Sequence, residues 1–88
     1  MININMFDLH QSIYLIENEK PVKTTSVPLN ELVEFVLGNE QWNKNIDEIE
    51  IDGNKNFIQK IGYDFKTSMQ KQFSNRNVRI LINGEVFN

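Results

Sequence analysis

Apolar and polar residues alternate along the first part of the chain in the manner of half-buried strands. In residues 2–6, three large apolar side chains alternate with two asparagines, a period of two that predicts a strand. Residues 12–17 and 22–27 are rich in β-branched and aromatic residues and flank the turn-forming sequence Asn-Glu-Lys-Pro at 18–21. The pattern therefore predicts an antiparallel meander of three strands.

Two segments have the longer period of an amphipathic helix. After Pro28, apolar residues recur at helical spacing until Gly38, which predicts the helix end, and Ser26 is available as a cap. From about residue 54 to 74 they recur every four positions, in a stripe about 160° wide at 100° per residue. The stripe consists of Phe57, Ile58, Ile61, Phe65, Met69 and Phe73. It predicts a long helix, in which Gly62 allows a close approach to a sheet.

A strand between the helices and a strand after them complete the pattern. In residues 45–53, isoleucines alternate with acidic residues until an Asp-Gly turn. Residues 77–82 alternate again, and the Asn-Gly pair at 83–84 is the usual signal of a two-residue hairpin turn. The order β-β-β-α-β-α-β predicts one domain, residues 1–88, of the α/β class, with α+β as the alternative. Two helices then pack on one mixed sheet through right-handed crossovers.

This order of elements resembles a minimal ribonuclease-H-like fold, the core shared with Holliday-junction resolvases and actin-like ATPase domains, ending after the fifth strand. A ferredoxin-like fold is the alternative if the first strand is absent. The resemblance implies metal-binding carboxylates on the first strand, on the first helix and at the end of the fourth strand. The matching positions are Asp8, Glu31 or Glu34, and Asp52. Such a cluster would hold two Mg²⁺ ions, so a metal-dependent nuclease is one functional alternative.

Charge is unevenly distributed along the chain. Residues 1–52 carry three lysines and ten carboxylates, a net charge of −7, whereas residues 53–88 carry six basic and two acidic side chains, a net charge of +4. The basic half makes a nucleic-acid-binding module a further alternative. Lys60 and Asp64 stand four residues apart on the predicted helix, and this spacing favours a locally compensated, solvated helix face.

An acidic row lies on the strand between the two helices. Glu48, Glu50 and Asp52 share one face at intervals of roughly 6.6 Å, comparable to successive phosphates of a nucleic-acid strand. The row is either the solvated side of a strand, paired with Arg79 of the neighbouring strand, or a phosphate-like surface that occupies the basic groove of an enzyme.

The two predicted helices cover one face of the sheet and leave the other face uncovered. That uncovered face is expected to show polar residues together with Phe7, Tyr14 or Leu15, Ile16 and Leu81, which makes it a predicted docking or homodimer surface. Trp42 lies in a polar connection and is either a lid on the core or an interface anchor.

Composition narrows the functional classes. The absence of cysteine excludes disulfides, thiolate metal sites and cysteine nucleophiles, and no stretch approaches the ~20 apolar residues of a membrane span, which favours a cytoplasmic protein. Abundant Asn, Ile and Lys without any Ala are typical of a low-GC bacterium or its phages. The sequence predicts a small regulatory binding protein without a cofactor, encoded by a phage or another mobile element. It is expected to inhibit a larger nucleic-acid-processing or defence enzyme by docking on it.

Overall fold

The computed structural model describes residues 1–7, 11–72 and 76–87. Within them lies one mixed sheet of six strands with three α-helices and a short 3-10 helix, an α/β fold as predicted. The strands are β1 (Ile2–Asn5), β2 (Gln11–Glu17), β3 (Lys20–Val27), β4 (Glu48–Asp52), β5 (Arg79–Ile82) and β6 (Glu85–Val86). The helices are η1 (Leu29–Glu31), α1 (Leu32–Gly38), α2 (Glu40–Asn43) and α3 (Lys55–Gln72).

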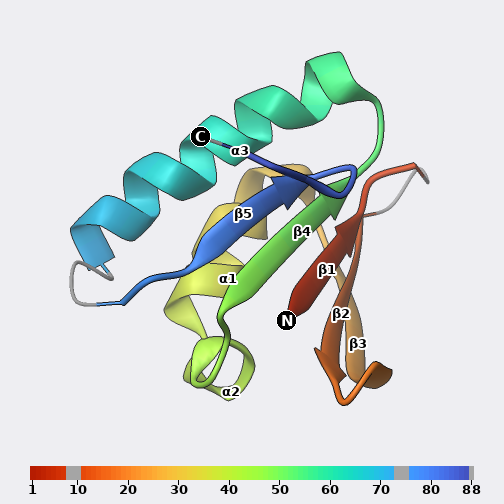
Figure 1. Cartoon of the computed structure of the whole chain (residues 1–88), viewed down its shortest axis with the longest axis vertical. Helices are drawn as coiled ribbons and strands as arrows, with labels where there is room; N and C mark the ends of the chain where they lie inside the picture. The colour runs from red at the N-terminus through yellow and green to blue at the C-terminus, as the bar shows by residue number, and fades with distance from the viewer. Residues whose placement is uncertain (8–10, 73–75, 88) are drawn as a thin grey trace.

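The strands follow the order β3-β2-β1-β4-β5-β6 across the sheet (Figure 1). β4 runs parallel to both β1 and β5, and the remaining neighbours are antiparallel, so the predicted meander and the two parallel crossovers are confirmed. β1 lies between β2 and β4, so the ferredoxin-like alternative, which required its absence, is wrong. The resemblance to a ribonuclease-H-like fold stays a prediction.

The β2–β3 and β5–β6 hairpins each turn through two residues with positive φ. The Asn-Gly prediction is confirmed, since Asn83 has φ 49° and Gly84 has φ 84°. In the β2–β3 hairpin, Asn18 and Glu19 have φ 53° and 65°, so this turn also has the handedness that matches twisted strands. The predicted turn at 18–21 is two residues too long because Lys20 already pairs with Glu17.

The core lies between the sheet and the helices on one face. Alternate residues of the strands point toward α1 and α3, and Ile2, Ile4, Ile49 and Ile51 have no exposed surface. Burying each such side chain contributes about 1.5–3 kcal/mol before chain entropy is subtracted. Gly62 of α3 allows the predicted close approach, because a Cβ atom there would lie 2.9 Å from Ile82 Cδ1 of β5.

The buried face of α3 is narrower than the apolar stripe that the sequence predicts. Phe65 is fully buried, whereas Phe57 is 46% exposed. At 100° per residue, Phe57 lies about 80° around the helix from Phe65, beyond the sector that faces the sheet. Phe73, at the other margin of the stripe, lies outside the described residues.

The first helix also begins differently from the prediction. Pro28 precedes a turn of 3-10 helix, and no side chain caps this turn, because Ser26 is still part of β3. α1 ends at Gly38 as predicted, but the polar connection after it contains the short helix α2.

Candidate functional site

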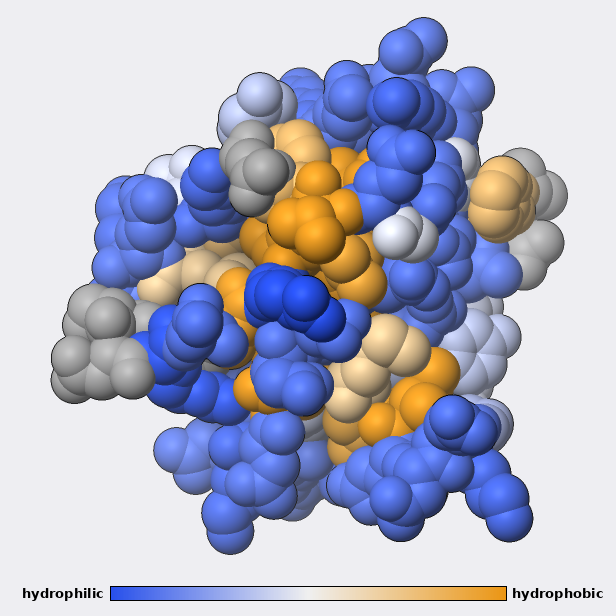
Figure 2. Space-filling view, viewed as in Figure 1, coloured by the Kyte–Doolittle hydropathy of each residue, from blue (hydrophilic) through white to orange (hydrophobic). Residues whose placement is uncertain are grey.

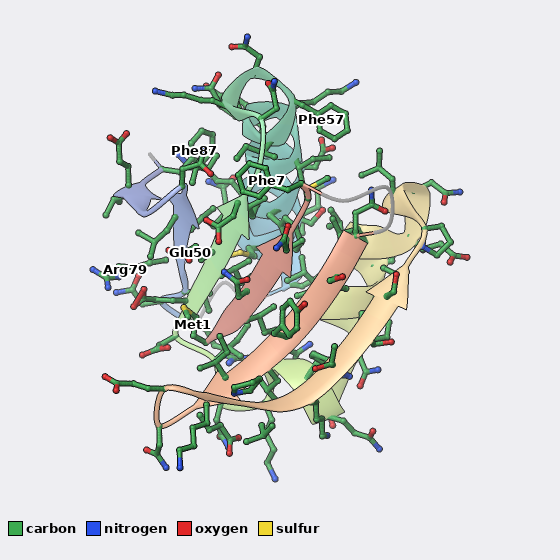
Figure 3. The ribbon with its side chains drawn as sticks, turned by 90° about the vertical axis from the view of Figure 1, so that its right-hand side faces the viewer. Met1, Phe7, Glu50, Phe57, Arg79 and Phe87 are labelled. Carbon is green, nitrogen blue, oxygen red and sulfur yellow. The ribbon has the colours of Figure 1, made fainter. Side chains whose placement is uncertain are left out.

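One face of the sheet has no helix over it within the described residues, and we call it the open face (Figure 3). Strand alternation directs onto it the residues that lie between the buried isoleucines. Register aligns one row across its centre: Tyr14 is opposite Asn3, Asn3 is opposite Glu50, and Glu50 is opposite Leu81. The row therefore places an acidic centre between an aromatic and an aliphatic side chain.

The first acid of the predicted row is neutralised by its neighbour. Arg79 Nη2 donates to Glu48 Oε2 at 2.9 Å, and the two side chains are 58% and 23% exposed. The predicted pairing of the acidic strand with Arg79 is thus confirmed for Glu48. Exposed pairs of this kind contribute about 0–1 kcal/mol, so the main effect is to balance the Glu48 charge.

Glu50 and Asp52 are joined by an amide from the adjacent strand. Asn3 Nδ2 donates to Glu50 Oε2 at 3.0 Å and to Asp52 Oδ2 at 2.9 Å. Burial raises the pKa of Glu50 above its ordinary value, and the Asp52 carboxylate raises it further, whereas the Asn3 hydrogen bond opposes these effects. The open face therefore holds two close carboxylates, one of which resists ionisation.

Two substitutions are expected to move the pKa of Glu50 in opposite directions. Asp52→Asn removes a neighbouring negative charge and lowers this pKa, whereas Asn3→Ala removes a donor to the carboxylate and raises it. Because the folded pKa of Glu50 is raised, its ionisation costs stability, and this cost appears as the pH rises through the folded pKa. A ¹³C NMR titration of the Glu50 carboxyl group measures both shifts. Asp64→Asn, on the helix side of the sheet, is the matched control and should leave the titration nearly unchanged.

Apolar side chains flank the acidic centre on both sides. Tyr14 and Ile16 of β2 and Leu81 of β5 are half-buried, and Val86 of β6 is 54% exposed. Figure 2, with α1 behind the sheet, shows hydrophobic surface over the β5 region and near the N-terminus, with hydrophilic residues between them. Leu15, the alternative to Tyr14 in the prediction, points into the core.

Trp42 lies away from the open face. Its side chain is buried, and its ring meets the Phe35 ring edge-on with 5.5 Å between centroids. The Asn39 side chain caps α2 by accepting from Gln41 N–H at 3.1 Å, and this short helix carries Trp42 into the core. The structure thus places Trp42 as a lid on the core, one of the two positions that the sequence allows.

Of the carboxylates that the nuclease alternative requires, those within the described residues are not brought together. Asp8 lies outside the described residues. Glu31 lies in η1 on the helix-covered side, whereas the Asp52 side chain lies on the open face with Asn3. Among the described residues, no group of three or more His, Cys, Asp or Glu side chains has an arrangement that could hold a metal ion.

The helix side of the molecule has a second surface feature that the sequence did not predict. A shallow groove of about 750 Å³ runs between η1–α1 and α3, and Leu29, Val33, Phe57 and Ile61 line it together with charged residues.

Charge differs between the two sides of the sheet. α3 carries four lysines and one aspartate. Most basic side chains of the second half of the chain therefore lie behind the sheet, and in front of it lie Glu50 and Asp52 of β4, which form no ion pair with another described residue.

Comparisons of the chain with protein-family models, curated proteins and solved structures found no match. No helix in the described part of the chain is long and apolar enough to cross a membrane.

Proposed function

We propose that the protein is a non-enzymatic regulator that docks the open face of its sheet onto a basic surface of a larger protein. The observation that carries the proposal is the central row of this face, in which Glu50 stands between Tyr14 on one side and Leu81 on the other. Protein interfaces combine an apolar, partly aromatic centre with complementary charge, and the row has both.

The Glu50–Asp52 pair supports a cationic contact on the partner. The two carboxylates repel each other and have one shared amide donor from Asn3. An arginine or lysine that approaches the pair relieves this repulsion and favours the ionised form of Glu50.

The finer proposal is that the partner is a nucleic-acid-processing or defence enzyme with a basic groove, and that a phage or another mobile element encodes this inhibitor. With Glu48 balanced by Arg79, the acidic row is too short to imitate a long run of phosphates. The apolar flanks therefore carry part of the contact, which favours a protein surface over imitation of a nucleic acid alone.

Charge reversal on the open face tests the proposal. The double variant Glu50→Lys/Asp52→Lys is expected to weaken binding to the partner at least about tenfold, because two attractive contacts become repulsive. Affinity capture from the native cell with the wild-type protein supplies the partner, and titration calorimetry measures the change in affinity. Glu19→Lys/Glu85→Lys, which changes the net charge equally at two hairpin ends, is the control and should retain most of the affinity.

NMR mapping of the complex separates this proposal from its alternatives. Amide signals of β1, β4 and β5 are expected to shift on binding, with little change along α3. Shifts confined to α3, or a salt-dependent complex with nucleic acid that requires Lys66 and Lys71, would show that the helix side is the working surface. Cleavage of nucleic acid that depends on Mg²⁺ and on Asp52 would show an enzyme.

A further inference from the structure

β3 is one of the two outer strands of the sheet, and no strand pairs with its outer edge within the described residues (Figure 3). Ile16 N–H donates to Met1 O at 2.8 Å, so even-numbered residues of β2 bond to β1 and odd-numbered residues bond to β3. Thr25 is opposite an odd-numbered residue and therefore bonds inward. Thr24 and Ser26 consequently direct their N–H and C=O groups outward.

Only part of this edge is protected against pairing with another strand. Pro21 lacks an N–H group, Lys20 adds an exposed charge, and the register shift between Leu15 and Ile16 of β2 marks a bulge that twists this end of the hairpin. Residues 24–27 contain neither charge nor proline, and they include β-branched residues that favour strands. The last half of β3 is thus an unprotected edge.

We propose that a second copy of this chain pairs with that edge, antiparallel and centred on Thr25, so that two sheets join into one of twelve strands. In this register, Thr24 of each copy lies opposite Ser26 of the other, and the outward N–H and C=O groups of both residues are all used. Thr25 meets Thr25 of the second copy, and Lys23 lies opposite Val27. Cross-strand threonine and serine pairs are favourable, and no like charges stand opposite each other.

The charges around β3 favour a second copy as the occupant. The strand carries Lys20 and Lys23 and no acid, and the segment that follows it carries Glu31 and Glu34 and no base as far as Gly38. Antiparallel pairing brings the basic start of one strand toward the acidic segment that follows the other. Because of the two-fold axis, this attraction between a basic and an acidic segment occurs twice in the dimer. An unrelated strand would need charges at the same places to provide it.

The pairing is independent of the partner proposed for the open face. The two-fold axis stands perpendicular to the joined sheet, so both open faces lie on the same side and both sets of helices lie on the other. Two acidic centres would then face in one direction. A partner with two basic sites could engage both centres at once.

Proline substitution at the outward position tests the pairing. Thr24→Pro removes an N–H group that points away from β2, so its own sheet keeps its hydrogen bonds, while the dimer loses one hydrogen bond per copy. The dimer dissociation constant is expected to rise about thirtyfold, whereas Thr24→Val, which keeps the N–H group, should stay within about threefold of wild type. Sedimentation velocity from about 10 to about 500 μM measures both, and circular dichroism checks the fold. A wild-type monomer throughout, or a dimer that Thr24→Pro leaves intact, overturns the proposal.

Disulfide trapping tests the register, even where the proline variant does not fold. The chain has no cysteine, and residues directly opposite at the centre of such a pair have Cα atoms about 4.5 Å apart, within disulfide reach. Thr25→Cys is expected to form a covalent dimer under mild oxidation at least about ten times faster than Thr67→Cys, an exposed position on α3. Equal rates for the two variants overturn the proposed register.

Discussion

Replacing Phe65 by alanine is expected to lower the free energy of unfolding by about 3–5 kcal/mol. Phe65 is the largest fully buried side chain among the described residues and lies midway along the buried face of α3. Alanine leaves a cavity between the helix and the sheet that the close-packed surroundings fill only in part. A domain of this length has a total stability of roughly 4–13 kcal/mol, so the loss is a large share of it. Urea unfolding followed by circular dichroism measures the loss, and the melting temperature should fall by about 15 °C or more.

Phe57→Ala is the matched control, since it makes the same chemical change on the same helix, two turns away. Phe57 is 46% exposed, so replacing it by alanine should lower the free energy of unfolding by no more than about 1 kcal/mol. Equal losses for the two variants would mean that the wide stripe predicted from the sequence, and not the narrower buried face of the structure, describes α3.

The order of strands and helices could be predicted because each signal is local. Ile49 and Ile51 alternate with acids and are fully buried in β4, and the Asn83-Gly84 pair forms the turn that its sequence predicts. Phe57 shows the limit of periodicity. A helical stripe gives the direction of the buried face, but its width depends on the shape of the surface beneath it.

The hydrophobic pattern did not predict α2, because little of the sequence evidence for this helix is periodic. The helix has four residues, and its evidence in the sequence is the capping residue Asn39 before it. Trp42 is the one large apolar residue in a polar segment, and without α2 the sequence left open whether this side chain lies on the core or at an interface. Whether such a short segment forms a helix depends on its tertiary packing.

The acidic row of the candidate site was predictable, whereas its chemistry was not. Alternation alone places Glu50 and Asp52 on one face of β4. The contact with Asn3 depends on the parallel register of β1 and β4, whose paired residues lie 47 positions apart in the sequence. The sequence offered one signal for this contact: the asparagines between the first isoleucines put amide donors on the polar face of a strand.

Asn43→Ala is expected to lower the free energy of unfolding by about 2–4 kcal/mol, the second large effect on stability. The Asn43 side chain is almost fully buried, and its Nδ2 donates to Val36 O at 2.9 Å and to Leu37 O at 2.8 Å. Both carbonyls belong to the end of α1, where no further helical turn satisfies them. Alanine removes the donor and leaves buried acceptors without it. Urea unfolding measures the loss, and Asn45→Ala, at an exposed position two residues later, should stay within about 0.5 kcal/mol of wild type.

Asn43→Asp distinguishes the loss of a donor from the loss of packing. The substitution keeps the size of the side chain but turns carboxylate oxygens toward the two α1 carbonyls, so at neutral pH it should cost more than Asn43→Ala. Burial and these carbonyls raise the pKa of the introduced carboxyl in the folded state above its unfolded value of about 3.9. The folded state then binds the proton more tightly, so the stability deficit grows as the pH rises through the folded pKa and shrinks as the pH falls. A deficit that is independent of pH would mean that the side chain at position 43 contributes by filling space, and that the link between α2 and the end of α1 is not its amide.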